Sequence, residues 1–367
     1  MKNYLDFEKE IKALEQDIDG LKSPFGSEGI SEVDTKKIKK TQNEINEKLR
    51  ETYANLNSWQ RTQVARHEDR PKANFYIKKI FSQFTLLSGD RYFGDDKSVI
   101  AGFGLIDKKS VLIIGQEKGE DLNSRIERNF GMMRPEGYRK CIRLMKLADR
   151  FQIPVVTFID TPGAYPGLGA EQRGQASAIA NSIECCMSLT VPNISIIIGE
   201  GGSGGAIALA SSNKVIMLEN SIYSVISPEG CASILWRDPS KSLQAAEAMK
   251  MTAKDLLKLG VIDEIISEPL GGAHRDPENI AAQLKQSIIK NLKNFDNLNK
   301  EEVYEHRKAK FLQIGRSQGF SKSSHLQNSL SYKESSIQKL KDHISEHKLA
   351  YLAAGVIGVT SLIALLF

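Results

Sequence analysis

Between residues 75 and 269 the chain repeats one pattern, in which a short apolar run alternates with a stretch of helical periodicity. The runs are rich in Val and Ile, as is typical of strands buried on both faces of a sheet. They occupy residues 111–114, 155–159, 194–198 and 215–218. Helical stretches such as 137–150 and 171–188 lie between them. This alternation predicts an α/β core with crossover connections.

A glycine-rich segment, GEGGSGGA at residues 199–206, directly follows the third apolar run. Glycines at a turn from strand to helix leave backbone N–H groups uncovered, and the helix that follows directs the positive end of its dipole to the same place. Such a turn suits an anionic group, either a phosphate or a developing oxyanion. A P-loop is excluded, because no Lys-Ser/Thr pair follows the glycines.

The same segment also fits the pattern G-x-S-x-G, which marks the nucleophile of serine hydrolases. Ser203 would be the nucleophile, and Asp263 and His274 follow it in the chain order of a hydrolase triad. Glycine-rich loops match this pattern by chance, so the signal is of low specificity. A serine hydrolase that uses Ser203 therefore stands as the alternative function.

A second loop, DTPGAYPG at residues 160–167, also follows an apolar run. Because ligands in open α/β sheets bind beyond the carboxyl ends of the strands, the two loops are expected to line one cleft. A third polar stretch begins at Gln116 and is followed by basic residues that could bind phosphates or a carboxylate. Each of these residues taken alone is better explained as a solvated surface charge. They are Arg125, Arg128, Arg134, Arg139 and Lys140.

Composition excludes several classes of protein. Hydrophobic residues make up 41% and charged residues 26% of the chain. These fractions exclude wholesale disorder and a polytopic membrane protein. A net charge of +5 is too small to indicate nucleic-acid binding. The four cysteines contain no C-x-x-C pair, so neither a zinc site nor a disulfide framework is expected in this chain. Free thiols and the absence of an apolar signal segment at the N-terminus favour a cytoplasmic location.

The two ends of the chain differ from the middle. Residues 3–22 predict an amphipathic helix and residues 34–56 a second, polar helix. The two could form a hairpin that packs on a partner or a flap on their own domain. Residues 277–311 read as helical, and the chain becomes a polar linker from about residue 315. Residues 349–367 carry no charge. As a helix they would be about 28 Å long, which predicts a C-terminal transmembrane anchor. The alternative is an apolar helix buried against the protein or an oligomer.

Residues 248–251 read AMKM, the pattern of a biotin-accepting lysine. An acceptor lysine must lie at an exposed hairpin tip of a small all-β domain. The flanking residues here are rich in Ala, Leu, Lys and Glu, which favour a helix. Lys250 is therefore not expected to carry biotin.

Read in order, these loops closely resemble the carboxyltransferase alpha subunit of bacterial acetyl-CoA carboxylase, over residues from about 5 to about 319. Many long motifs in the same order make chance agreement implausible. The motifs lie at 60–70, 87–96 (LLSGDRYFGD), 128–140 (RNFGMMRPEGYRK), 160–167 (DTPGAYPG), 199–206 (GEGGSGGA), 223–236 (YSVISPEGCASILW) and 268–275 (EPLGGAHR).

The resemblance implies an α/β fold of the crotonase-like (ClpP/crotonase) type, built from ββα units with an N-terminal helical segment and C-terminal helices. It implies transfer of the carboxyl group from carboxybiotin, on the biotin carboxyl carrier protein, to acetyl-CoA, giving malonyl-CoA for fatty-acid synthesis. The transferase would contain two alpha and two beta subunits. It would be served by biotin carboxylase, so that the complete enzyme complex binds ATP. The beta subunit would hold the zinc and most of the CoA site.

The chain departs from the family pattern after about residue 319, where relatives usually end. Four parts are therefore expected: an N-terminal helical segment (1–60), the carboxyltransferase domain (61–319), a polar linker (320–348) and the anchor (349–367). The anchor is not implied by the resemblance. It would tether a cytoplasmic enzyme to the cytoplasmic face of a membrane, because lysines precede it.

The resemblance also implies which residues act. Two anions develop in the transfer, the biotin ureido enolate and the thioester enolate, and both need N–H donors that are already in place. The backbone amides of Gly204 and Gly205 are assigned to the biotin side as an oxyanion hole. Ser203 then has no nucleophilic role. The residues expected to contact substrate are Gly201, Gly202, Gly163, Ala164 and Tyr165.

Overall fold

The computed structural model describes residues 3–22, 25–26, 29–30 and 35–316. The chain divides into two units, residues 1–319 and 320–367. The predicted linker and anchor, residues 320–367, lie outside the described residues. No helix in the described part is both long enough and apolar enough to cross a membrane.

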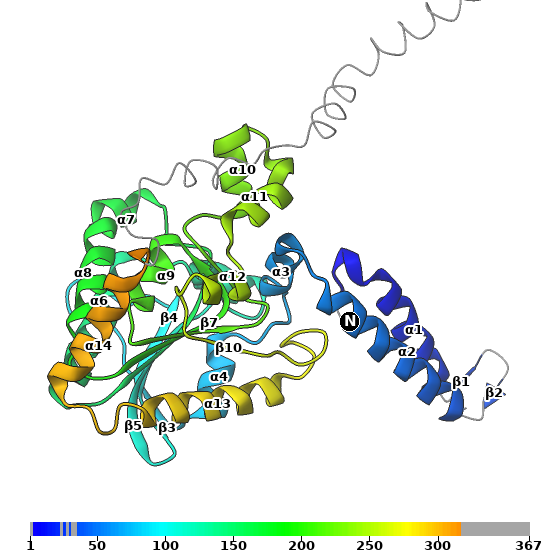
Figure 1. The fold of residues 1–367 in the computed structure, drawn as a ribbon, viewed down its shortest axis with the longest axis horizontal. Helices are drawn as coiled ribbons and strands as arrows, with labels where there is room; N and C mark the ends of the chain where they lie inside the picture. The colour runs from blue at the N-terminus through cyan, green and yellow to red at the C-terminus, as the bar shows by residue number, and fades with distance from the viewer. Residues whose placement is uncertain (1–2, 23–24, 27–28, 31–34, 317–367) are drawn as a thin grey trace, which may run out of the picture. The chain divides into compact units, whose positions relative to one another are not determined.

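A mixed sheet of eight strands forms the centre of the first unit (Figure 1). Its order is β10-β8-β7-β6-β5-β4-β3, with β9 paired to the end of β7. Strands β5 to β8 and β10 are parallel, while β3, β4 and β5 pair in antiparallel fashion. The strands are β3 (Ser82–Leu86), β4 (Val99–Ile106), β5 (Lys109–Gln116), β6 (Val155–Thr161), β7 (Asn193–Gly202), β8 (Lys214–Leu218), β9 (Ile222–Ser224) and β10 (Glu264–Ile266).

The four apolar runs are confirmed as strands β5 to β8. Every residue of β6 and β7 is buried, because helices cover both faces of the parallel region. The sequence did not predict β4, since two glycines interrupt it. A Cβ at Gly102 would lie 2.0 Å from the Thr85 carbonyl oxygen. The glycine is therefore needed for the close approach of the neighbouring strand.

Helices surround the sheet. The helices that follow the N-terminal segment are α3 (Ser58–Ala65), α4 (Ala73–Ile80), α5 (Leu122–Glu127), α6 (Pro135–Arg150), α7 (Leu168–Gln172), α8 (Gln175–Ser188), α9 (Ser203–Ala210), α10 (Pro228–Trp236), α11 (Ser242–Met249), α12 (Ala253–Lys258), α13 (Pro277–Lys293) and α14 (Lys300–Gln313). Among the described residues there are three short 3₁₀ helices. η1 (Asp6–Glu8) precedes the N-terminal helices, η2 (Asn129–Gly131) lies between α5 and α6, and η3 (Pro239–Lys241) lies between α10 and α11.

Two predicted helices are each divided in the structure. The stretch 171–188 breaks at Gly174, whose φ of 81° is left-handed. A left-handed glycine commonly ends a helix, so α7 ends and α8 begins there. The stretch 277–311 breaks between α13 and α14, where Asn299 caps the second helix by accepting a hydrogen bond from the Glu302 amide. The crotonase-like expectation of an α/β core with C-terminal helices is otherwise met by this arrangement.

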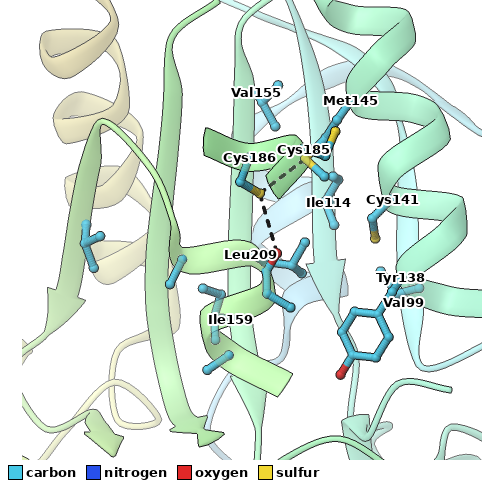
Figure 2. Close-up of a cluster of buried hydrophobic side chains, with 14 of the residues drawn as sticks. Val99, Ile114, Tyr138, Cys141, Met145, Val155, Ile159, Cys185, Cys186 and Leu209 are labelled. Atoms are coloured by element: carbon cyan, nitrogen blue, oxygen red, sulfur yellow. Dashed lines mark hydrogen bonds between the residues drawn. The ribbon is translucent and has the colours of Figure 1, made fainter. Parts of the chain in front are cut away.

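Each face of the sheet has its own apolar core. Helices α4 and α13 pack on one face, and α6, α8 and α9 pack on the other (Figure 1). Figure 2 shows Cys141, Cys185 and Cys186 among the apolar side chains of the second core. Burial raises the pKa of the Cys141 thiol to about 12. This sulfur therefore stays protonated and behaves as a small apolar group.

The two N-terminal helices are confirmed as α1 (Lys9–Lys22) and α2 (Thr35–Ala54), which pack on each other; β1 (Phe25–Gly26) and β2 (Gly29–Ile30) pair between them. Arg275, in the loop after β10, donates hydrogen bonds to Glu15 at 2.5 Å and to Glu8 at 3.2 Å. The Tyr53 hydroxyl donates to the same Glu8 at 3.0 Å. The Arg275 contacts therefore join the N-terminal helical segment to the loop after β10 of the same chain.

Candidate active site

The glycine-rich turn connects β7 to α9. Strand β7 continues to Gly202, and α9 begins at Ser203. Ser203 has a left-handed backbone, with φ of 51°. This conformation is strained for a residue with a side chain. Gly204 and Gly205 are the second and third residues of α9. Their amides belong to the first turn, where N–H groups have no carbonyl partner within the helix. The structure thus places the two proposed donors at the positive end of a helix.

The two glycine-rich loops touch through their backbones. A Cβ at Gly205 would lie 2.5 Å from the Gly163 carbonyl carbon and 2.9 Å from the Ala164 nitrogen. A Cβ at Gly202 would lie 2.2 Å from the Pro162 carbonyl oxygen. Only glycine permits this approach. The structure therefore brings Gly163 and Ala164 directly against the proposed oxyanion hole, as expected of residues in one cleft.

Side chains hold the two loops in register. Gln116, the last residue of β5, donates to the Gly205 carbonyl oxygen at 2.8 Å. The Thr161 hydroxyl donates to the Gly163 carbonyl oxygen at 2.7 Å. Tyr165 is half-buried, and its ring lies 4.5 Å from the Arg134 guanidinium carbon. The ends of β5, β6 and β7 are thus joined at one edge of the sheet.

A network of charges lies beside this turn, buried at Asp160 and Glu200 and partly exposed at Arg66 and Glu229, and the sequence did not reveal it. The Lys118 ammonium lies 2.8 Å from an Asp160 oxygen and 2.6 Å from a Glu200 oxygen. Arg66 contacts Glu200 at 2.6 Å and Glu229, on α10, at 2.5 Å. Burial alone would raise the pKa of Glu200, but Lys118 and Arg66 lower it to about 2. Glu200 therefore stays ionised at neutral pH, directly before Gly201.

The sequence could have indicated only some of the residues of this network. Asp160 and Glu200 each stand at the end of a predicted strand, which is the one signal they give. Their partners Lys118 and Arg66 are 82 and 134 positions away from Glu200 along the chain. No local pattern joins such positions.

The hydrolase alternative is wrong, because its three residues are not assembled. Asp263 accepts hydrogen bonds from Lys310 at 2.5 Å and from the Val215 amide at 2.7 Å. Val215 is near the start of β8, whereas Ser203 follows the end of the parallel strand β7. His274 stacks on His67, with ring centroids 3.9 Å apart. Both proposed partners of Ser203 are thus held by other groups.

The basic residues after Gln116 are not all solvated surface charges. Lys140 is buried and donates to Asp95 at 2.7 Å and to the carbonyl oxygens of Asp96 and Val99, both at 2.8 Å. Arg139 donates to Asp90 at 2.7 Å. These two side chains hold the loop before β4 in place. The expectation of a surface charge was wrong for Lys140, because its partners lie 41 to 45 positions upstream.

The remaining basic residues and the AMKM segment have ordinary structural surroundings. Arg128 donates to the Lys97 carbonyl oxygen at 2.7 Å, and Arg134 donates to the Asn129 side chain at 3.1 Å. Arg125 lies 3.5 Å from Glu68. Lys250 follows the last residue of α11, and α12 begins at Ala253, so the flanks are helical. Within the described ranges, no cluster of three or more His, Cys, Asp or Glu could hold a metal ion.

Comparison with known proteins places this architecture in a family. A family model described as acetyl co-enzyme A carboxylase carboxyltransferase-like matches residues 4–315. An acetyl-coenzyme A carboxylase carboxyl transferase subunit alpha from Pelagibacter ubique is 66% identical over 95% of this chain and 95% of its own length. That match is 349 residues long and so extends beyond residue 319. The corresponding subunit of Mesorhizobium japonicum is 54% identical over 86% of this chain and 100% of its own length.

Solved structures share the fold at low sequence identity. A chain of a Pseudomonas malonate decarboxylase hetero-tetramer in complex with coenzyme A matches with a TM-score of 0.53 and 15% identity, over 68% of this chain and 100% of that one. A chain of transcarboxylase 12S matches with a TM-score of 0.50 and 18% identity, over 62% of this chain and 42% of that one. The chain therefore covers less than half of the transcarboxylase polypeptide, and these two likenesses support the fold alone.

Proposed function

The chain belongs to the acetyl-CoA carboxylase carboxyltransferase-like family, and from this premise we propose that it is the alpha half of a carboxyltransferase active site. In this role it takes part in moving a carboxyl group from carboxybiotin to acetyl-CoA, which gives malonyl-CoA. The observation that best supports the role is the start of α9, where the amides of Gly204 and Gly205 lie in the first helical turn and Gly205 lies against the backbone of the second loop. This geometry suits stabilisation of an oxyanion and needs no side-chain nucleophile.

The residues of the chain divide the work as follows. The amides of Gly204 and Gly205 donate hydrogen bonds to the ureido oxygen, where negative charge develops as the carboxyl group leaves. The backbone of Gly163 and Ala164 fixes the position of Gly205, and Gln116 fixes its carbonyl group. Carboxybiotin supplies the activated carboxyl group and, once decarboxylated, a base for the acetyl proton. Removal of one preorganised donor typically costs about 3–4 kcal/mol of barrier.

The proposed partners follow from the name of the subunit type. Relatives are named as alpha subunits, and one structural neighbour is part of a hetero-tetramer. We assign the CoA site and the zinc ribbon mainly to a beta subunit, in a complex of two alpha and two beta chains. The biotin carboxyl carrier protein delivers the carboxyl group, and biotin carboxylase, which uses ATP, loads it. ATP binding is not assigned to this chain.

The C-terminal segment is proposed to locate this activity at a membrane. Residues 349–367 carry no charge, and Lys339, Lys341 and Lys348 precede them. The proposal predicts that the full-length chain stays in the membrane pellet after carbonate extraction, whereas a chain ending at residue 319 is released. Release of both chains would contradict it, without affecting the proposed transferase activity.

The test of the transferase function uses the full-length chain co-purified with its beta subunit. Decarboxylation of malonyl-CoA, followed in the presence and absence of a biotin analogue, reports the reverse reaction. We expect turnover that depends on the analogue and on both chains. A stable complex with no turnover in either direction would contradict the proposal and would favour a scaffold role. Each subunit alone is the matched control.

A further inference from the structure

A cavity of about 450 Å³ opens where three consecutive parallel strands end. Lys118 follows β5, Pro162 follows β6, and Glu200 lies near the end of β7. Ligands of open α/β sheets bind beyond such strand ends, and the volume suits a small organic molecule. The lining residues are Ala65, Arg66, Lys72, Lys118, Arg125, Phe130, Met132, Pro162 and Glu200. The cavity borders the proposed active site, because the Pro162 carbonyl group touches Gly202.

Among the described residues that line the cavity, Lys72 is the one cation without a counter-ion. Arg66 and Lys118 are held by the carboxylates described above, and Arg125 lies 3.5 Å from Glu68. For Lys72, no carboxylate of the described residues lies within ion-pair distance. Its ammonium donates only to the carbonyl oxygens of His67 at 3.4 Å and Glu68 at 3.1 Å. Lys72 has just 8% of its surface exposed, so this charge is largely removed from water.

Burying an ammonium without a counter-ion costs free energy, which favours the neutral amine. Burial, together with repulsion by Lys118 and Arg125, lowers the pKa of Lys72 to about 8, although Asp160 opposes the change. An anion bound beside Lys72 would remove the cost. Lys72 is the one cation of the lining that has no carboxylate within ion-pair distance among the described residues, and a single free ammonium matches a monoanion better than a phosphate dianion. Phe130 and Met132 offer an apolar wall for the carbon part of such a ligand.

From these observations we propose that the cavity is a carboxylate-binding subsite, in which Lys72 is the main ionic partner of a carboxylate carried by a small organic group. The inference rests on the proposed function, which supplies two such groups. One is the carboxylate of carboxybiotin, and the other is the carboxylate of malonyl-CoA. Both are monoanionic carboxylates attached to a larger group, so the same subsite accepts either.

Three variants test the subsite in the complex with the beta subunit. Lys72→Met removes the charge and keeps much of the length of the side chain, and Lys72→Arg restores the charge. Lys78→Met is the matched control, because Lys78 lies on α4, the helix that Lys72 precedes, but is exposed and does not line the cavity. We expect Lys72→Met to raise the KM for malonyl-CoA or for the carboxylated carrier at least about tenfold, equivalent to about 1.4 kcal/mol. Lys72→Arg should recover most of this loss, and Lys78→Met should change nothing.

The direction of the reaction distinguishes the two sources. An increase in the KM for malonyl-CoA alone, in decarboxylation, identifies the thioester carboxylate. An increase in the KM for the carboxylated carrier alone, in the forward reaction, identifies carboxybiotin. An unchanged KM in both directions overturns the inference but leaves the proposed function intact. Absence of turnover by the wild-type complex would instead contradict the proposed function, and the following binding test would still decide the subsite.

The binding test needs no turnover. Monomethyl malonate, which carries one carboxylate, is added to the wild-type complex during limited acetylation by acetic anhydride. Mass spectrometry then gives the rate of modification of each lysine. The carboxylate should slow modification of Lys72 at least about threefold and leave Lys78 unaffected. Dimethyl malonate, which has no carboxylate, is the control and should have no effect. Equal rates for Lys72 with both esters would overturn the inference.

Discussion

Gly205→Ala is the substitution that most directly probes the proposed oxyanion hole. The added Cβ would lie 2.5, 2.7 and 2.9 Å from three backbone atoms of Gly163 and Ala164. Ordinary contacts begin at 3.4 Å, so the loop must retreat by about 0.5–0.9 Å. Displacements of about 1 Å at a reacting centre cost about 10²-fold in rate, and loss of one oxyanion donor costs about 10²–10³-fold. We therefore expect turnover to fall about 10²–10³-fold.

The same clash should also reduce stability. Forcing a methyl group into a packed site typically costs about 1–3 kcal/mol, so the melting temperature of Gly205→Ala should decrease while the chain still folds. Gly204→Ala is the steric comparison, because its Cβ would meet only Ile179 side-chain atoms at 3.5 and 3.6 Å. Its melting temperature should not fall. A bulkier residue such as Val at position 205 would confound loss of activity with loss of folding.

The assay is decarboxylation of malonyl-CoA by the complex with the beta subunit, measured alongside binding of that subunit. Gly20→Ala is the activity control, since it lies in α1 and a Cβ there meets no atom of the described residues within 4 Å. It should turn over at the wild-type rate. If Gly205→Ala also turned over within about threefold of wild type, the reasoning that links the contact of the two loops to catalysis would be refuted.

Three further substitutions test other parts of the structure. Arg70→Met leaves Glu268 buried without its partner. It should lower the free energy of unfolding by about 3–5 kcal/mol in urea titrations, and a change below about 1 kcal/mol would contradict this. His274 has a pKa lowered to about 3, chiefly by burial, so the unfolded chain binds its proton first. Stability should therefore fall as pH decreases from about 6.5 towards 3, by up to about 1.4 kcal/mol per pH unit. His274→Phe should flatten this dependence, and equal slopes would exclude the histidine as its cause. Lys118→Met removes the cation between Asp160 and Glu200. Because Lys118 contributes most to lowering the pKa of Glu200, the acid limb of the pH–turnover profile should then move to higher pH by at least about one unit and return with Lys118→Arg. An unmoved limb in Lys118→Met would show that ionisation of Glu200 does not affect turnover.

The parallel core could be predicted from the sequence because its signal is local. The runs that form β5 to β8 are apolar on both faces, and a glycine-rich loop follows two of them. The place of the candidate site follows from that order, since parallel strands bring their carboxyl ends to one edge. What the sequence could not give was contact between backbones. Nothing in residues 160–167 or 199–206 shows that Gly205 lies against Gly163.

The unpredicted features depend on partners far apart in the chain. Strand β4 contains Gly102 and Gly104, which weaken any strand pattern and are explained only by the close approach of β3. Lys140 reads as a surface residue of a charged helix until Asp95 is brought beside it. Lys72 likewise gives no signal in the sequence. It becomes a candidate only when the cavity is known, together with the absence of a carboxylate within ion-pair distance among the described residues.

The central claim is most directly tested by forward transfer of a labelled carboxyl group. The carrier protein, loaded with labelled carboxybiotin, is mixed with acetyl-CoA and the full-length chain bound to its beta subunit. The account predicts labelled malonyl-CoA from the wild-type pair, and at about one-hundredth of that rate or less when the chain carries Gly205→Ala. Transfer by the beta subunit alone, or by the Gly205→Ala pair at the wild-type rate, would contradict it.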